Sequence, residues 1–120
     1  MTVLLIAVGA ALGAPLRYLT DRAVQARHDS VFPWGTLAVN VAGSLLLGAV
    51  IAIPATPAAT ALVGTGFCGA LTTWSTLSYE TLRLAREGAR RHALANVLVS
   101  LVAGLAAASL GYVLARAVTG

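Results

Sequence analysis

Four long apolar runs constrain this chain more than any other feature of its sequence. They cover about residues 3–19, 35–53, 58–82 and 93–117, and nearly all charged residues lie between them or at their ends. A helix needs roughly 20 mostly apolar residues to cross a bilayer. Open sheet edges find no partner in lipid, and the alternating segments of membrane barrels are absent from the sequence. The runs therefore predict an all-α membrane protein with four transmembrane helices in a single domain, residues 1–120.

The composition supports a membrane protein over a soluble one. Only 10% of the residues are charged and 58% are hydrophobic, whereas about 25% of a soluble domain is charged. The net charge of +4 comes from eight arginines and no lysine. These arginines lie in loops and at helix ends, without the basic face or aromatic platform typical of nucleic-acid binding. We expect a membrane protein that faces anionic lipid.

The arginines are distributed unequally between the two sides of the membrane. The loops between spans 1 and 2 and between spans 3 and 4 share one side. With the adjoining helix ends, that side holds seven arginines: Arg17, Arg22, Arg27, Arg83, Arg86, Arg90 and Arg91. Arg116 is alone on the other side. The positive-inside rule then places both basic loops in the cytoplasm of a multi-pass protein of the cell membrane, in one orientation.

The third apolar run contains a stretch that weakens a helix. "GFCGALTTWSTLS", residues 66–78, holds two glycines, two serines, three threonines and a cysteine. Serine and threonine side chains compete for backbone hydrogen bonds, and glycine loosens a helix. We expect this helix to be broken near mid-membrane, with a plain kink as the alternative. A break exposes carbonyls that can hold a small cation and amides that can hold an anion, and it is tolerated only inside protein or beside a cavity.

Small and polar residues recur at helical spacing in the other runs. Gly9 and Gly13 form a GxxxG pattern, which allows close helix packing. Two polar stripes with a spacing of four residues consist of Thr36, Asn40 and Ser44 in span 2 and of Asn96, Ser100 and Gly104 in span 4. Residues four apart lie on one face of a helix. The stripes predict either interhelical hydrogen bonds or the lining of a narrow polar path, with Asn40 the strongest candidate because a buried amide needs a partner or a ligand.

Three motifs carry a resemblance to a known family. They are "GAALGAPLRY" (residues 9–18), "FPWGTLAVNVAGSLLLG" (32–48) and "GFCGALTTWSTLSYE" (66–80). Along essentially its whole length the chain resembles the Fluc (CrcB) fluoride channels. The resemblance implies a fluoride-specific channel that exports fluoride passively across the cytoplasmic membrane and so reduces fluoride toxicity. It also implies an antiparallel dimer with two pores.

The resemblance also implies roles for individual residues. A structural sodium ion at the dimer axis would be held by the backbone carbonyls of Gly69 and Thr72. Arg17 and Glu80 match charged positions of a vestibule or of the structural framework. The residues that match the fluoride pore are Asn40, Trp74, Ser75, Thr76, Asn96 and Ser100.

Two departures from the family pattern bear on assembly. The family carries TTFSTF where this chain reads TTWSTL, so Leu77 replaces an aromatic ring whose edge would face fluoride. Asn96 stands where many members have an aromatic hydroxyl. Together with the arginine bias, Leu77 favours a dimer with a second family member of opposite orientation, and a homodimer remains the alternative.

Other classes of protein fit the sequence less well. A small multidrug exporter has a similar length but relies on a glutamate in its first span, and span 1 has no acidic residue. A subunit that does not conduct by itself, or conducts only with a partner, is a further alternative. A membrane enzyme is disfavoured because the sequence presents no nucleophile–base or metal-binding constellation, so we expect no enzymatic activity.

Overall fold

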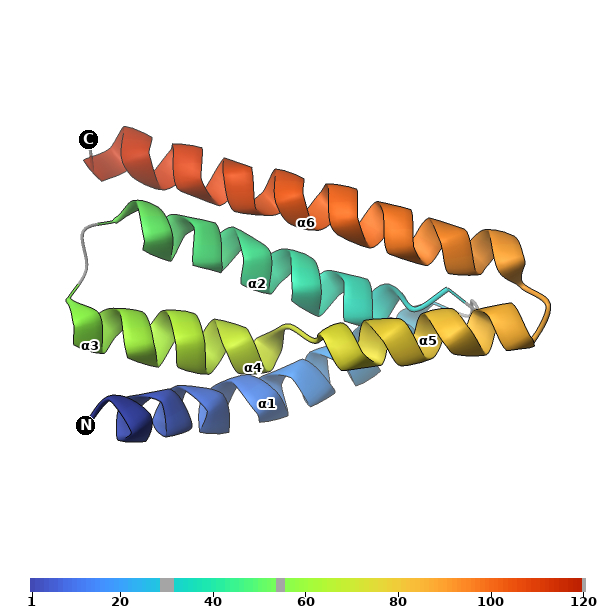
Figure 1. Cartoon of the computed structure of the whole chain (residues 1–120), viewed down its shortest axis with the longest axis horizontal. Helices are drawn as coiled ribbons and strands as arrows, with labels where there is room; N and C mark the ends of the chain where they lie inside the picture. The colour runs from blue at the N-terminus through green and yellow to red at the C-terminus, as the bar shows by residue number, and fades with distance from the viewer. Residues whose placement is uncertain (29–31, 54–55, 120) are drawn as a thin grey trace.

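The computed structural model describes residues 1–28, 32–53 and 56–119, and these residues are helical without strands. Figure 1 shows the helices arranged as an elongated bundle. The order of elements is α1 (Thr2–Arg27), α2 (Trp34–Ala52), α3 (Pro57–Ala59), the π-helical η1 (Thr60–Cys68), α4 (Gly69–Leu71), α5 (Trp74–Arg86) and α6 (Arg90–Thr119). The all-α fold is therefore confirmed.

Within the described residues, three helices are long and apolar enough to cross a membrane: α1, α2 and α6. The third apolar run is divided instead. Its first part comprises α3, η1 and α4, its second part is α5, and Thr72 and Thr73 separate the two. The two parts follow each other along the bundle with a visible offset between α4 and α5 (Figure 1). The expected break is thus confirmed, while a fourth membrane crossing formed by the two parts together stays a prediction.

Several helix boundaries differ from those expected. The first helix runs to Arg27 rather than to about residue 19, α5 ends at Arg86, and α6 covers Arg90–Thr119. Hydropathy indicates where a helix is apolar, not where its hydrogen bonds end. Residues 20–27 include alanine, arginine and glutamine, which are good helix formers, so α1 continues beyond its apolar part. The residues 29–31 of the first basic loop lie outside the described part of the chain.

Glycines allow close contact between α1 and the first half of the divided helix. A Cβ added at Gly66 of η1 would lie 2.6 Å from the carbonyl oxygen of Ile6 and 3.0 Å from the Cα of Gly9, both in α1. A Cβ at Gly13 would lie 2.5 Å from the Phe67 carbonyl oxygen. Backbones in such contact leave no space for a side chain. The packing role expected of Gly9 and Gly13 is confirmed, and it joins α1 to the first half of the divided helix.

A second glycine contact joins α2 to α6. A Cβ at Gly48 would overlap the carbonyl of Ala108, and one at Gly111 would overlap the carbonyl of Leu45. The backbones of α2 and α6 are therefore in direct contact at a glycine of each helix. This leaves α5 packed mainly against α6, with its polar side facing α2.

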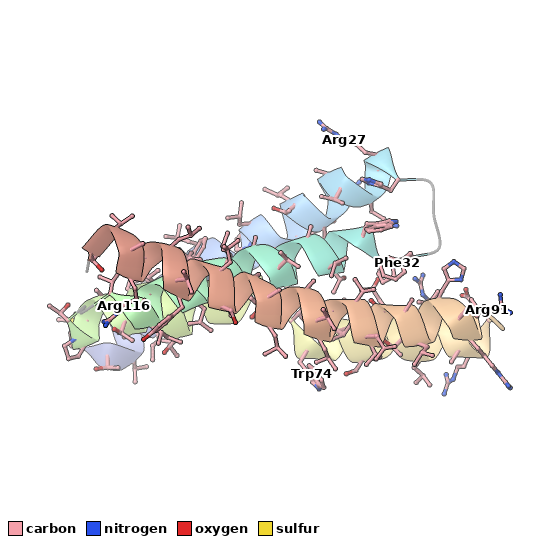
Figure 2. The ribbon with its side chains drawn as sticks, turned by 90° about the horizontal axis from the view of Figure 1, so that it is seen from above. Arg27, Phe32, Trp74, Arg91 and Arg116 are labelled. Atoms are coloured by element: carbon pink, nitrogen blue, oxygen red, sulfur yellow. The ribbon has the colours of Figure 1, made fainter. Side chains whose placement is uncertain are left out.

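The two ends of the bundle differ in charge. Both chain termini lie at one end (Figure 1). Arg116 lies near that end, whereas Arg27 and Arg91 lie at the opposite one (Figure 2). One labelled arginine from each basic loop thus lies away from the end that holds the two termini.

Candidate functional site

The break between α4 and α5 is a short extended segment with its own hydrogen bonds. Thr72 has φ −80° and ψ 158°, and Thr73 has φ −150° and ψ 124°, both in the extended region. The Thr72 hydroxyl donates to the carbonyl of Cys68 at 2.9 Å. The Thr73 hydroxyl accepts the N–H of Thr76 at 3.1 Å and so caps α5. The two threonines therefore end one helix and begin the next.

Asn40 of α2 holds this segment from the side. Its Oδ1 accepts the N–H of Thr73 at 2.7 Å, and its Nδ2 donates to the carbonyl of Thr73 at 3.1 Å. One side-chain amide thus satisfies both backbone groups of a residue that a helix would otherwise have satisfied. One N–H of Asn40 remains beyond these two bonds.

The break also leaves backbone carbonyls at the end of α4 without their helical partners, among them those of Gly69 and Thr72. In a continuous α-helix the Gly69 carbonyl would accept the N–H of Thr73, and the Thr72 carbonyl would accept the N–H of Thr76. The first amide donates to Asn40 and the second to the Thr73 hydroxyl. These carbonyls are the two that the family resemblance assigned to a cation. Oxygen atoms of this kind are ligands for hard cations, and the donor set of Gly69 and Thr72 fits such an ion.

A groove of about 350 Å³ lies beside the break, between α2, α5 and α6. Its polar lining consists of Asn40, Ser44, Thr72, Thr73 and Ser100, and its apolar lining includes Trp74, Leu77 and Gly104. The structure therefore brings Asn40, Trp74 and Ser100 together, as expected of a shared path. Two residues of each polar stripe line this groove, Asn40 and Ser44 from α2 and Ser100 and Gly104 from α6, whereas Thr36 and Asn96 do not.

The aromatic positions of the groove differ in exposure. Trp74 is 69% exposed, and Figure 2 shows its side chain pointing away from the bundle. Leu77 is buried and lies between this groove and a second, apolar one along α5 and α6. The ring that the family pattern has at this position would therefore sit inside the protein, not on its surface.

Ser100 and Asn96 are buried polar residues of α6 that retain unused hydrogen-bonding capacity. Asn96 is fully buried, and its Nδ2 donates to the Thr81 hydroxyl at 2.9 Å. That hydroxyl donates in turn to the carbonyl of Leu77 at 2.8 Å. The Asn96 Oδ1 and the Ser100 hydroxyl have no hydrogen-bond partner among the described residues. Because buried polar groups are normally paired, these two atoms are candidates for contact with a ligand or water.

The remaining predicted pore residues lie at the start of α5. Ser75 is exposed, and its hydroxyl lies 3.5 Å from that of Thr73. Thr76 is half-buried and faces a different pocket from Asn40. The structure thus does not bring Ser75 and Thr76 into the groove that contains Asn40 and Ser100. Thr73, which lines both spaces, connects them.

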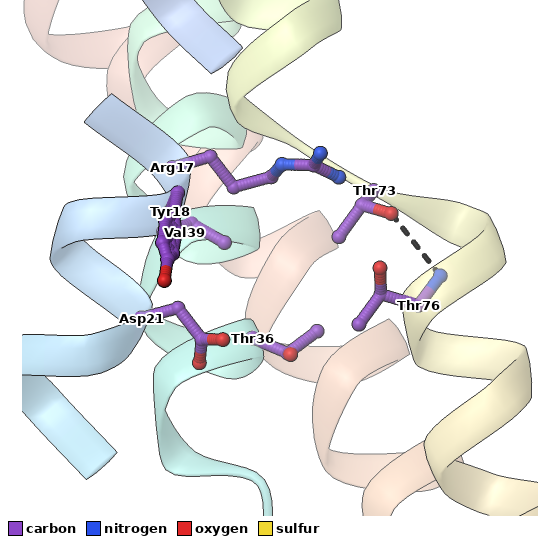
Figure 3. Close-up of a pocket in the computed structure, with 7 residues that line it drawn as sticks. All are labelled: Arg17, Tyr18, Asp21, Thr36, Val39, Thr73 and Thr76. Carbon is purple, nitrogen blue, oxygen red and sulfur yellow. Dashed lines mark hydrogen bonds between the residues drawn. The ribbon is translucent and has the colours of Figure 1, made fainter. Parts of the chain in front are cut away.

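That second pocket has a volume of about 210 Å³ and a charged lining. Arg17 extends from α1 across the pocket toward Thr73 (Figure 3). The pocket is completed by Tyr18, Asp21, Thr36, Val39 and Thr76. A guanidinium beside hydroxyls and the capped end of α5 makes a polar environment suited to an anion.

Glu80 has a partner that the sequence did not indicate. The Thr36 hydroxyl donates to the Glu80 carboxylate, which ties α2 to α5. This bond lies one helical turn from the Asn40 contact on α2. Glu80 is therefore part of the framework that holds α5 against α2, which is one of the two roles expected for it.

Sequence reasoning missed Thr73 and Thr81 as members of the site. Thr73 was expected only to weaken the helix, yet its N–H donates to Asn40, its carbonyl accepts from Asn40, and its hydroxyl caps α5. A signal was present in the spacing: Thr36 and Asn40 are four residues apart on α2, and Thr73 and Glu80 are seven apart. Both intervals keep residues on one helix face, so the two pairs were able to meet as they do.

Comparisons with known proteins identify the family of this chain. The family model described as CrcB-like protein, Camphor Resistance (CrcB), matches residues 4–112. A relative from Frankia casuarinae named Fluoride-specific ion channel FluC 1 is 62% identical, with the whole of both chains covered. One of the same name from Streptomyces avermitilis is 57% identical over 98% of each chain. Fluoride-specific ion channel FluC 2 of Rhodococcus jostii is 48% identical, over 93% of this chain and 96% of its own. With the family model spanning nearly the whole chain, this protein belongs to the CrcB family.

Proposed function

We propose that this chain is a subunit of a fluoride-specific ion channel that lets fluoride leave the cytoplasm passively through the cell membrane. The observation that carries the proposal is the groove beside the break. There Asn40 and Ser100 present an amide and an unpaired hydroxyl to a common space. Relatives at 48–62% identity are named for this activity.

The groove suits a small anion that loses its hydration shell when it enters. Fluoride accepts strong hydrogen bonds, and N–H and O–H donors can replace its hydration shell. Asn40 retains one N–H beyond its two bonds to Thr73, and Ser100 retains its hydroxyl. In the neighbouring pocket the cationic Arg17 attracts anions, and the Asp21 carboxylate in the same lining opposes that attraction. Transfer from the Arg17 pocket to the groove would pass Thr73, which lines both.

The proposal includes a structural sodium ion at the break. The Gly69 and Thr72 carbonyls would hold it, because both have lost their helical amide partners. Gly69 is exposed, and no atom lies within 4 Å of a Cβ built on it. That open side would accommodate the corresponding carbonyls of a second subunit. When bound, the ion supplies positive charge in a site of low dielectric, where it favours a nearby anion.

We further propose that the subunits form an antiparallel dimer with a second family member of opposite orientation. Seven arginines lie on one side of the predicted topology and one on the other. A single orientation follows from the positive-inside rule, and an antiparallel homodimer would need half the copies inverted. Leu77 supports the same assembly, since a partner with an aromatic residue there would supply the ring that this chain lacks.

Fluoride efflux from liposomes tests the channel. The protein is reconstituted alone and together with a second family member of opposite arginine bias, and a fluoride electrode follows release down the gradient. We expect fluoride release well above that of empty liposomes for the pair, with little chloride release. No release above empty liposomes, or equal chloride release, would refute the proposal. Equal activity of the chain alone would leave the channel standing and replace the heterodimer with a homodimer.

A further inference from the structure

The hydrogen bonds of Asn40 assign it a role beyond that of a pore donor. We propose that Asn40 is a positioning residue for the cation site: its amide draws the Thr73 N–H away from the Gly69 carbonyl and keeps that carbonyl free for the ion. The inference rests on the proposed function, because it concerns the sodium ion included there. It connects a residue of α2 to a site built from the backbone of the divided helix.

Asn40 holds the backbone of Thr73 through two hydrogen bonds. The Thr73 N–H reaches Asn40 Oδ1 at 2.7 Å, the shorter of the two bonds, and the Thr73 carbonyl is held by Nδ2 at 3.1 Å. The N–H and the carbonyl of Thr73 therefore both point toward α2. The extended backbone of Thr72 and Thr73 is compatible with these bonds and not with a helix.

Without Asn40, the N–H of Thr73 would need another acceptor. The half-buried N–H of Thr73 would favour another acceptor, and the nearest one in sequence that helical geometry offers is the carbonyl of Gly69. Closing that bond would extend α4 by one residue and turn the carbonyl into the helix. The Thr73 hydroxyl cannot serve as the acceptor instead, because it already accepts the N–H of Thr76.

Loss of the Asn40 bonds should affect sodium binding itself and not only the stability of the fold. Thr36 provides a natural comparison, since it lies on the same face of α2 and also donates a hydrogen bond to the divided helix, at Glu80; it is buried, whereas Asn40 is half-buried. Its bond is one turn away from the break and touches neither Gly69 nor Thr72. Loss of either bond should weaken the fold, but only loss of the Asn40 bonds should change the affinity for sodium.

The experiment measures sodium-dependent thermal stability, which needs no ion flux. The purified protein, with its partner subunit where the assembly requires one, is heated in detergent while sodium chloride replaces N-methylglucamine chloride at constant ionic strength. A ligand that binds the folded state raises the unfolding temperature with its concentration. We expect Asn40→Leu to raise the half-saturating sodium concentration roughly tenfold or more, since two hydrogen bonds are lost. Thr36→Val should lower stability equally at all sodium concentrations.

A second variant guards against a failure to fold. Asn40→Ser keeps a polar group but is too short to bridge both groups of Thr73, so it should also raise the half-saturating concentration. Wild-type sodium affinity in whichever Asn40 variant folds would overturn the inference, as would an equal loss of affinity in Thr36→Val or a wild-type protein without sodium-specific stabilisation. Fluoride efflux of the wild-type protein, measured separately, decides the proposed function independently of these outcomes.

Discussion

Removing the Ser100 hydroxyl should stabilise the protein while impairing conduction. Its oxygen is buried without a hydrogen-bond partner among the described residues, and such a group costs about 1–3 kcal/mol. Ser100→Ala removes that penalty and leaves an oxygen-sized void. At about 24 cal/mol per Å³ of cavity, the void costs roughly 0.5 kcal/mol. We therefore expect the free energy of unfolding to rise by about 1 kcal/mol, and fluoride flux to fall because a donor leaves the groove.

A threonine in the same region offers a control of opposite sign. The Thr81 hydroxyl accepts from Asn96 at 2.9 Å and donates to Leu77 at 2.8 Å. Thr81→Val removes both bonds and leaves the Asn96 amide unpaired, so it should lower stability by about 1–3 kcal/mol. The two variants differ only in whether the lost hydroxyl is bonded in the folded protein.

Two measurements on the same samples check this prediction. Unfolding of the detergent-solubilised protein by sodium dodecyl sulfate, followed by circular dichroism, reports the change in stability. Fluoride efflux from liposomes reports conduction. A Ser100→Ala variant less stable than the wild type would show that the hydroxyl is bonded within the folded protein, contrary to the reasoning. Unchanged flux would show that Ser100 lies outside the ion path.

Three further predictions concern packing, topology and the pore. Gly66→Ala should destabilise the bundle, because its Cβ would lie 2.6 Å from a carbonyl of α1, whereas Gly64→Ala, with its nearest neighbour at 3.7 Å, should be tolerated; thermal unfolding compares them, and equal stability would contradict the close contact. With Cys68 replaced by alanine, a cysteine at Ala89 between α5 and α6 should react with impermeant reagent only from the cytoplasmic side, and similar labelling from both sides would show dual topology. Leu77→Phe should increase fluoride efflux by the chain reconstituted alone, because it restores a ring at the groove, and unchanged efflux would indicate that the missing ring does not limit conduction.

The broken helix shows how far local sequence reasoning can reach. Glycine, serine and threonine between residues 66 and 78 weaken a helix through properties of each residue, so the break was predictable without knowledge of its neighbours. The extended conformation of Thr72 and Thr73 confirms it. The contact through Gly9 and Gly13 was predictable for a similar reason, since a GxxxG pattern defines a close-packing face whatever the partner.

The candidate site was predictable only in part. Asn40 and Ser100 were expected to share a polar path, and they line one groove. Three other residues assigned to the same path do not line this groove: Ser75 is exposed, Thr76 lines the Arg17 pocket, and Asn96 is bonded to Thr81. The length of α1 was also underestimated, since hydropathy reports the apolar part of a helix and not the extent of its hydrogen bonds.

The sequence by itself determined that this is a helical membrane protein with a divided helix. It did so through apolar runs of membrane length, arginines gathered in two loops and a polar interruption in the third run. These features act through the periodicity and composition of single segments. Only the tertiary structure decided that Asn40 holds Thr73, that Thr36 holds Glu80 and that Asn96 holds Thr81. Such bonds join residues 15 to 44 positions apart, and a hydrogen bond of about 3 Å depends on the register and rotation of two packed helices. Helix packing, set here by backbone contacts at glycines, fixes that register, and no single segment of the sequence specifies it.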